Sequence, residues 1–231
     1  MESLEAELEQ AKDLSVAELA DAIEAIGFEC TRCGACCKAA DTDDGAGKEP
    51  HTATLFPDEA RDLQDAAEDT FDEEYDWRDV ARPMPYGISE SENGPEGETF
   101  EWAIQTDDCD NCTFYEEDED GTGACTVHDG RPLVCRTYPF SVALGGTSQP
   151  MGEAVDSEGI VRAHECEGLG RDISREEAED LAAALKERAV RELEEAIDLR
   201  DAYEPRPDAD GVVVHDSEGA KRPDGTRLES R

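Results

Sequence analysis

Basic residues are scarce in this sequence. The chain of 231 residues has 61 acidic residues against 21 basic ones, a formal net charge of -40, and only five of the basic residues are lysines. Such a surface repels nucleic acid phosphates and anionic lipids, so we expect neither nucleic acid nor membrane as a partner. The acids are spread along the whole chain, and molar salt would screen their repulsion beyond about 3 Å. The charge therefore favours adaptation to a salt-rich cytoplasm.

Long apolar runs are also missing. No segment approaches the roughly 20 apolar residues that a membrane-spanning helix needs. The opening MESLEAELEQAKDL lacks the basic region and the apolar stretch of a signal peptide. We therefore expect a cytoplasmic protein, in a compartment where thiols are usually kept reduced.

The motifs of several common enzyme classes are absent as well. The sequence has no G-x-G-x-x-G, no Walker loop, no Ser/His/Asp pattern and no H-E-x-x-H. Aromatic residues make up 6% of the chain and hydrophobic residues 37%, which is enough for a modest core only. A thin core favours a fold that is stapled by metal.

Cysteine, in contrast, is abundant and clustered. The stretch FECTRCGACCKAAD holds four cysteines in the spacing C-x2-C-x2-C, with the fourth directly after the third. The other five lie in the contexts CDNC, GACTVHDGRPLVCRTYPF and HECEGLG. In a reducing compartment, nine cysteines favour metal binding or redox catalysis over structural disulfides, which would also leave one cysteine unpaired.

The number of sulfurs leaves several arrangements open. Four thiolates complete one tetrahedral zinc site or one iron–sulfur cubane, so nine could supply two sites with one spare, or one site with bystanders. In extended backbone successive side chains point to opposite faces. Cys36 and Cys37 are therefore expected to serve two neighbouring sites, or two corners of a larger cluster, rather than one ion. The C-x2-C-x2-C run resembles the bacterial ferredoxin pattern, although its C-x3-C-P continuation is missing.

The hydrophobic pattern predicts a small α+β fold with short hairpins between helical ends. Capping boxes at Ser15 and Ser174 mark helix starts, and Pro57 suits the first turn of another helix. Helices are predicted over 2–26, 57–68 and from about 174, hairpins over 84–106 and 112–128, further strands in FSVALGG, EAVD and GIVRA, and a polar linker over 41–52. The predicted segments are an N-terminal helical segment (1–27), a cysteine-cluster metal-binding domain (28–170), a C-terminal helix (171–203) and a mobile acidic tail (204–231).

The cysteine contexts together resemble the YkgJ-type cysteine-cluster family, also called the CxxCxxCC zinc- or iron-chelating domain. Its opening pattern F-x-C-x2-C-G-x-C-C matches residues 28–37, and a later block matches residues 125–140. Cys112-Thr-Phe-Tyr fits a segment between them, and Cys166 fits a late cysteine near glycines. The resemblance implies a cysteine-rich metal or iron–sulfur domain. Cys109 lies outside the family's usual set, which makes it the expected spare.

From the spacing and the resemblance together we predict a metal-binding protein. An iron–sulfur cluster, [4Fe–4S] above all, is favoured over zinc because the run is ferredoxin-like and sulfur is in surplus. Arg131 and Arg136 are predicted to offset the charge of clustered thiolates. Two cysteine groups are expected to converge on folding: Cys30, Cys33, Cys36 and Cys37 in one, and Cys112, Cys125, Cys135 and Cys166 in the other.

Three classes of function stay open at this point. A metal-binding or electron-transfer module, with a redox protein as its partner, ranks first. An iron–sulfur oxidoreductase or a methyl-transfer enzyme would need a substrate-sized cavity beside the cluster, and some larger relatives are linked to flagellin lysine methylation. A zinc-stapled scaffold would need a closed site. His128 and His164 could also ligate metal, although there are enough cysteines without them.

Overall fold

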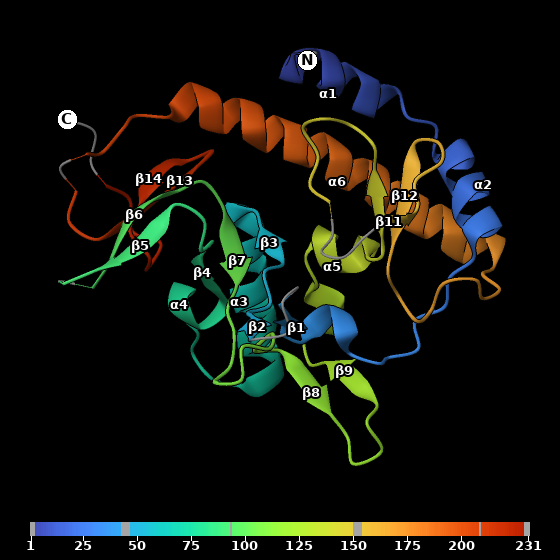
Figure 1. Ribbon diagram of the computed structural model, residues 1–231, viewed down its shortest axis with the longest axis horizontal. Helices are drawn as coiled ribbons and strands as arrows, with labels where there is room; N and C mark the ends of the chain where they lie inside the picture. The colour runs from blue at the N-terminus through green and yellow to red at the C-terminus, as the bar shows by residue number, and fades with distance from the viewer. Residues whose placement is uncertain (1–2, 43–46, 93, 150–153, 208, 229–231) are drawn as a thin grey trace. The chain divides into compact units, whose positions relative to one another are not determined.

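The computed structural model describes residues 3–42, 47–92, 94–149, 154–207 and 209–228. It confirms the predicted α+β class, with helices near both ends of the chain and many short strands between them (Figure 1). The chain divides into two compact units. We call residues 1–33, 119–122 and 133–197 the helical unit, and residues 34–118, 123–132 and 198–231 the strand-rich unit.

In its described residues, the helical unit is built on four helices and a small sheet. Ser3 and Ser15 each accept a hydrogen bond from a first-turn amide, which fixes where the two N-terminal helices begin. Glu177 and Ser174 exchange hydrogen bonds before the C-terminal helix, so the predicted capping box there is confirmed. The elements are α1 (Leu4–Asp13), α2 (Val16–Ile26), α5 (Leu133–Thr137), β10 (Phe140–Val142), β11 (Ala154–Asp156), β12 (Val161–His164) and α6 (Arg175–Ala202).

One apolar core joins the parts of this unit. In Figure 1 the blue helices α1 and α2 lie along the orange α6, and α6 packs against them through alanines and leucines. The sheet has the antiparallel order β10-β12-β11. The Phe28 ring meets the buried Phe140 ring edge-on at a centroid distance of 5.7 Å. The fully buried members of the core include Ala11, Leu19, Ala20, Ile23, Phe140, Ala178, Ala182, Leu185 and Leu193.

A buried arginine ties α6 to the segment that carries Cys135. Arg188 is 2% exposed. Its Nε donates to Glu192 at 2.8 Å, and its two terminal nitrogens donate to the Thr137 hydroxyl at 3.0 Å and the Ser148 carbonyl at 2.8 Å. Because a guanidinium has five donors in a fixed plane, these bonds hold the end of α5 in one position on α6.

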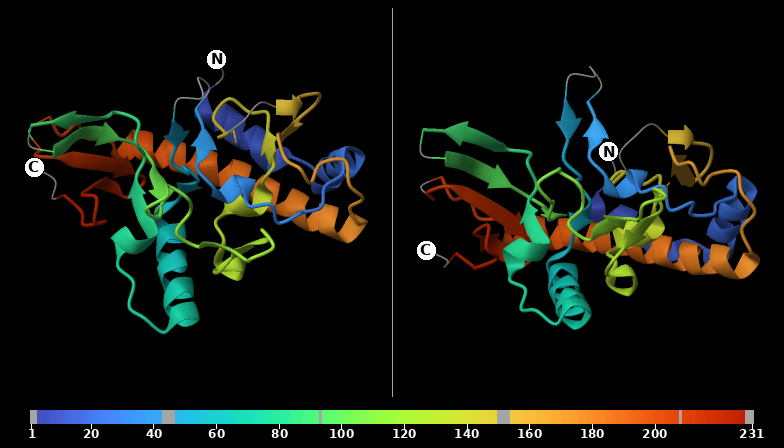
Figure 2. Two further views of the ribbon diagram at one scale, coloured as in Figure 1. Left: turned by 60° about the horizontal axis from the view of Figure 1, so that its bottom comes forward. Right: turned by 90° about the horizontal axis from the view of Figure 1, so that it is seen from below.

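The strand-rich unit consists of short elements in several sheets. Figure 2 shows the green hairpin β5–β6 with the red strand β13 beside it, and β13 pairs with β6 in parallel. The elements are a 3₁₀ turn (Ala35–Cys37), β1 (Ala40–Asp41), β2 (Lys48–Glu49), β3 (Thr54–Leu55), α3 (Pro57–Phe71), α4 (Trp77–Val80), β4 (Ala81–Pro83), β5 (Ile88–Ser91), β6 (Gly94–Thr99), β7 (Trp102–Ile104), β8 (Tyr115–Glu117), β9 (Gly123–Cys125), a second 3₁₀ turn (His128–Gly130), β13 (Val212–Asp216) and β14 (Gly219–Lys221).

A polar network lies beside the apolar core of this unit. Trp102 is fully buried, and its indole donates to Asp216 at 2.8 Å. Lys221, itself 2% exposed, pairs with Asp216 at 2.8 Å and with Glu218 at 2.7 Å. Arg61 on α3 pairs with Glu218 at 2.6 Å. These charges join α3 to the C-terminal strands.

Three predicted segments differ from the structure. The tail after residue 204 was expected to lack structure, but β13 and β14 form there, because Val212 to Val214 are buried against β6. The predicted hairpin over 84–106 ends at Thr99, since β7 pairs with β3 and β4 instead. Its predicted turn residue Asn93 lies outside the described residues. The predicted linker over 41–52 contributes to a two-stranded pairing of β1 with β2.

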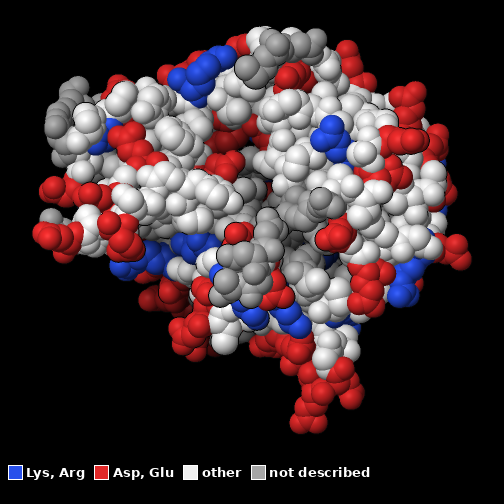
Figure 3. All heavy atoms as spheres, in the orientation of Figure 1, with Lys and Arg blue, Asp and Glu red and all other residues white. Residues whose placement is uncertain are grey.

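The surface carries the excess of acid that the composition predicts. Acidic side chains stand out at many points of the face in Figure 3, and basic ones at few. Within the described part of the chain, no helix combines the length and the apolar character that crossing a membrane requires.

Candidate metal centre

The nine cysteines are divided between the two units. All nine are free thiols. Of each predicted group of four cysteines, two lie in the helical unit and two in the strand-rich unit. The structural units therefore group the cysteines differently from the prediction made from sequence spacing. The helical unit holds Cys30, Cys33, Cys135 and Cys166, and the strand-rich unit holds Cys36, Cys37, Cys109, Cys112 and Cys125.

The adjacent pair Cys36 and Cys37 lies on a tight turn rather than on extended backbone. Gly34 adopts the left-handed conformation, with φ of 75°, and starts the 3₁₀ turn. A Cβ at this position would also collide with the ring of Tyr115, so the turn requires glycine. The turn places the two sulfurs 3.8 Å apart. The expectation that they would point to opposite faces is therefore wrong, because its premise of extended backbone does not hold here.

Cys112 and Cys125 approach the same turn from the β8–β9 hairpin. The Cys112 amide donates to the Cys37 carbonyl at 2.8 Å, which joins the hairpin to the turn. Tyr115 pairs with Cys125 in the β8–β9 register, and its amide donates to the Cys112 carbonyl at 3.0 Å. Cys112 is buried and Cys125 is half-buried. Within the strand-rich unit, three segments thus bring four cysteines into one neighbourhood.

The electrostatics show that these thiols interact. A hydrogen bond with Cys37 raises the pKa of Cys36 above the usual range of a thiol. The pKa of Cys112 is raised to about 12, mainly by burial and to a smaller extent by charge on Cys125 or Cys36. Burial also raises the pKa of Cys125, and the guanidinium of Arg131 acts against that rise. Without an ion these thiols hold their protons, so a metal would have to displace them.

Arg131 and Arg136 have different positions. Arg131 lies in the strand-rich unit, and its Nε donates to the His128 carbonyl at 2.9 Å. The pKa values of Cys36 and Cys125 are both raised overall, and the positive charge of Arg131 opposes the rise in each. Arg136 lies on α5 in the helical unit, next to Cys135 in the sequence. The predicted role in offsetting thiolate charge thus has an electrostatic basis for Arg131.

Lys38, Tyr115 and Glu117 form a polar clamp beside the turn that the sequence analysis did not predict. Lys38 follows Cys37 and forms an ion pair with Glu117 on β8. The Tyr115 hydroxyl donates to Glu117 at 2.6 Å, and the Lys38 ammonium lies 5.3 Å from the Tyr115 ring centroid. The sequence signals that could have found this clamp are a lysine directly after the cysteine pair and a tyrosine three residues after Cys112.

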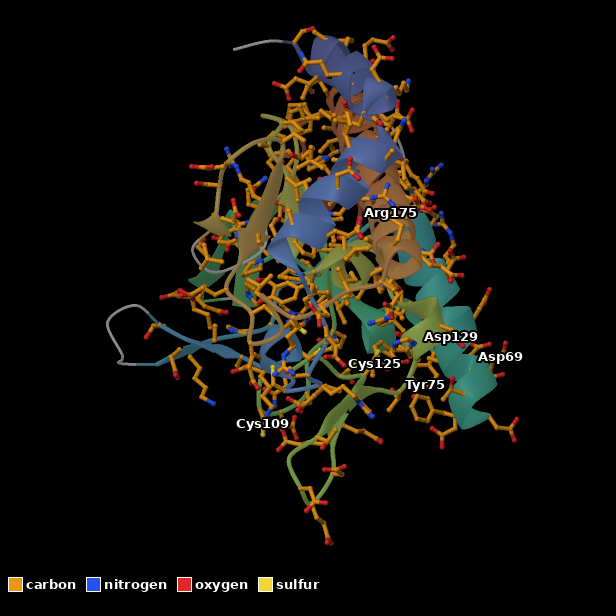
Figure 4. All side chains as sticks on the ribbon, turned by 90° about the vertical axis from the view of Figure 1, so that its right-hand side faces the viewer. Asp69, Tyr75, Cys109, Cys125, Asp129 and Arg175 are labelled. Carbon is orange, nitrogen blue, oxygen red and sulfur yellow. The ribbon has the colours of Figure 1, made fainter. Side chains whose placement is uncertain are left out.

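Cys109 stands on a separate loop. Figure 4 shows Cys109 and Cys125 well apart within the strand-rich unit. Cys109 is exposed, and its amide donates to the Asp107 carboxylate at 2.8 Å. Asn111 accepts a hydrogen bond from the Ala39 amide at 3.0 Å, so this loop is tied to the segment after the cysteine turn by side chains other than Cys109.

Two cysteines of the helical unit, Cys30 and Cys166, lie near one antiparallel bridge. Phe28 forms a bridge with Leu169, which places Cys30 and Cys166 near the same end of the paired segments. The Gly168 amide donates to the Cys166 sulfur at 3.4 Å. Cys135 lies on α5, and Cys33 ends the first stretch of this unit.

The two histidines near cysteines have other neighbours. His128 is exposed and lies 3.3 Å from the Asp129 carboxylate. His164 is buried, with its Nε2 3.0 Å from the Ser141 hydroxyl. Among the residues that the structure describes, no three Cys, His, Asp or Glu side chains already have the arrangement of an ion's ligands. Loading would therefore require side chains to close around the metal.

Comparisons with known proteins agree with this chemistry. The model of the family CxxCxxCC, described as "Putative zinc- or iron-chelating domain", matches residues 29–167. Curated proteins and solved structures gave no match to the chain. The matched range contains all nine cysteines, from Cys30 to Cys166.

Proposed function

Because this chain belongs to the CxxCxxCC family of zinc- or iron-chelating domains, we propose that its strand-rich unit binds one zinc or iron ion through four thiolates. The proposed ligands are Cys36, Cys37, Cys112 and Cys125. Thiolates are the ligands that zinc and iron accept in tetrahedral sulfur sites. When bound, the ion would staple the cysteine turn to the β8–β9 hairpin, and iron would add a one-electron couple that zinc lacks.

The distance between Cys36 and Cys37 carries this proposal. With metal–sulfur bonds of about 2.3 Å, the edge of a sulfur tetrahedron is about 3.8 Å. The two sulfurs lie 3.8 Å apart. In a cubane each cysteine ligates a different iron, so this close pair favours a single ion over the [4Fe–4S] cluster that the ferredoxin-like run suggests.

The charge of the site supports the same assignment. Four thiolates around a divalent ion carry roughly two net negative charges, which are costly to bury without compensation. Arg131 acts electrostatically on both Cys36 and Cys125, so it is within range to offset part of that charge. Lys38 adds a second cation, held beside the turn by Glu117. We propose Arg131 as the main compensating group.

Metal analysis of the purified protein tests this function. The protein would be prepared without oxygen in molar salt, and its zinc, iron and acid-labile sulfide would be counted. We expect bound zinc or iron, no sulfide, and loss of an ion in Cys112→Ser. Cys109→Ser is the matched control, because it removes a thiol only three residues from Cys112 in the sequence and should keep the metal. Stoichiometric acid-labile sulfide would instead establish an iron–sulfur cluster, and a metal content that Cys112→Ser leaves unchanged would contradict the ligand set.

A further inference from the structure

We infer that a cluster of aromatic rings on the strand-rich unit binds a small organic cation with a quaternary ammonium head. The rings are Phe100, Tyr203 and His215, and Glu98 supplies the opposite charge. We call these four residues the aromatic patch. The inference goes beyond the proposed function, because the patch contains no cysteine and does not depend on a metal.

Three segments that are far apart in the sequence meet at the aromatic patch. Phe100 directly follows β6, His215 lies on β13, and Tyr203 directly follows α6. β13 pairs with β6 in parallel, with Val214 opposite Thr99 (Figure 2). The next residues along the two segments, His215 and Phe100, are therefore neighbours. All of these residues belong to the strand-rich unit, so the pairing of its sheet fixes the place of the patch.

The three rings contact one another, but only two of them reach the solvent. Phe100 stacks on His215 at a centroid distance of 5.6 Å, and Tyr203 meets His215 edge-on at 4.8 Å. The centroids of Phe100 and Tyr203 are 5.5 Å apart. His215 is 1% exposed, whereas Phe100 is 47% and Tyr203 39% exposed. A single exposed ring is ordinary, but two adjoining ones over a buried third form an apolar patch of the kind that ligands use.

Glu98 holds a negative charge beside these rings. Its carboxylate lies 3.4 Å from the Nε2 of His215, and its side chain is 26% exposed. Burial lowers the pKa of His215 from its usual value of 6.5, so the imidazole is neutral at pH 7 and does not cancel the charge of Glu98. The guanidinium of Arg206 also acts on His215, and it pairs with Glu204 at 3.2 Å. The patch therefore keeps a negative charge next to its exposed rings.

The hydrogen bonds of Glu98 select the kind of cation. One carboxylate oxygen accepts from the Tyr203 hydroxyl at 3.2 Å, and the other accepts from the Arg206 amide at 2.9 Å. Both oxygens are thus engaged, which suits a cation that donates no hydrogen bond. A primary ammonium or a guanidinium would have to compete for these oxygens.

The rings favour the same choice. The face of an aromatic ring attracts a cation that lies within about 6 Å of its centroid. A quaternary ammonium has methyl groups that bury well against Phe100 and Tyr203, so it gains from the apolar surface and from the charge together. An alkali cation keeps its water shell and gains little from the rings. Anions are repelled by Glu98 and by the net charge of -40.

A titration followed by nuclear magnetic resonance tests the inference on the full chain in molar potassium chloride. The probe is tetramethylammonium chloride, and tert-butanol is the neutral probe of similar shape. The chain has six phenylalanines and five tyrosines, so the ring signals of Phe100 and Tyr203 can be assigned from single variants. We expect tetramethylammonium to shift both sets of signals saturably at one site. We expect tert-butanol to bind about 10-fold more weakly, because it lacks the charge.

Three variants locate the site. Phe100→Leu keeps an apolar side chain but removes the ring, and Glu98→Gln keeps an acceptor oxygen but removes the charge. We expect each to weaken the binding of tetramethylammonium about 5-fold. Phe71→Leu is the matched control, since Phe71 is a ring of similar exposure, 38%, that stacks on Tyr75 elsewhere in the same unit. It should leave the affinity unchanged.

Tryptophan fluorescence melts of each variant would show that the strand-rich unit is still folded. If Glu98→Gln does not fold, Phe100→Leu still decides, because it changes only a half-exposed ring. Equal binding of tert-butanol and tetramethylammonium would overturn the inference, since the patch would then be apolar without selecting a cation. Equal losses in Phe100→Leu and Phe71→Leu would overturn it as well. So would ring signals of Phe100 and Tyr203 that do not shift in the wild type.

Discussion

The two units carry similar numbers of cysteines, but different interactions hold the segments on which these cysteines lie. In the helical unit the cysteine segments are attached to an apolar core of three helices and a sheet, and Arg188 fixes the end of α5. In the strand-rich unit the turn that carries Cys36 and Cys37 depends on a glycine, on one backbone bond to Cys112 and on the exposed pair of Lys38 with Glu117. The comparison indicates that a metal would contribute more to the strand-rich unit than to the helical one.

The chain offers a natural way to observe the units separately. Both tryptophans, Trp77 and Trp102, lie in the strand-rich unit, and their rings meet at a centroid distance of 4.9 Å. Most of the helical residues lie in the helical unit. Tryptophan fluorescence therefore reports on the strand-rich unit, and the helical circular dichroism signal reports mainly on the helical unit.

Removal of metal should have the largest effect. Thiolate ligation can contribute on the order of 10 kcal/mol to the folding of small metal domains. We expect a chelator to lower the fluorescence melting temperature strongly and the helical signal much less. Molar salt should offset part of the loss, because it screens acid repulsion. Melts followed by both probes across a salt series would check this, and coincident transitions in apo and loaded protein would contradict it.

Arg188→Met should show the opposite pattern. The variant leaves Glu192, whose side chain is 9% exposed, without its partner, and it also leaves Thr137 without a donor. Breaking a buried ion pair in this way costs about 3 kcal/mol. In urea denaturation, the helical circular dichroism signal should therefore be lost at a lower urea concentration than the tryptophan fluorescence signal. Arg175→Gln is the control, because Arg175 pairs with acids on the surface, and its loss should leave the helical transition nearly unchanged.

Gly34→Ala should weaken the strand-rich metal site alone. Its left-handed backbone and the nearby Tyr115 ring leave no room for a Cβ. The strain should cost about 1–3 kcal/mol and distort the turn under the two sulfurs. In a zinc titration we expect the affinity of the strand-rich unit for zinc to fall. Gly121→Ala is the matched control, since Gly121 also has positive φ but has open space around it. Equal effects of the two variants on zinc binding would contradict the role of the turn.

Glu218→Gln should give the smallest effect, and one that depends on pH. Arg61, and after it Lys221, lower the pKa of Glu218 from 4.5 to about 2. A lowered carboxyl pKa stabilises the folded state above the unfolded value, and this stabilisation is lost as the pH falls toward the folded value. We expect the variant to be about 1 kcal/mol less stable at pH 7, with the gap closing between about pH 4.5 and 2. A gap that is independent of pH in fluorescence-detected unfolding would exclude the ion pairs as its source.

Local signals predicted the helices but not the partners of distant strands. Ser15 and Ser174 mark helix starts by their own side chains, and Pro57 begins α3 as expected. In contrast, β13 pairs with β6 more than a hundred residues away, at the register of Val213 with Glu98. Nothing in the Pro- and Gly-rich C-terminal sequence specifies that partner, so the strand was missed.

The cysteine pattern predicted the chemistry of the site better than it predicted how the cysteines are arranged in space. Spacing selected the thiols that the family match covers, while the pairing of Cys36 with Cys37 followed from the conformation of Gly34. The division of the cysteines between units depends on how 28–37 and 125–140 each cross from one unit to the other. Such crossing points are set by tertiary packing and leave no local pattern in the sequence.

X-ray absorption at the edge of the bound metal tests the central claim most directly. For protein loaded in molar salt, we predict a first shell of about four sulfur atoms at about 2.3 Å and no metal–metal scattering. A first shell of nitrogen and oxygen would contradict thiolate chelation. A short iron–iron distance would contradict the single-ion site built on the close pair of Cys36 and Cys37.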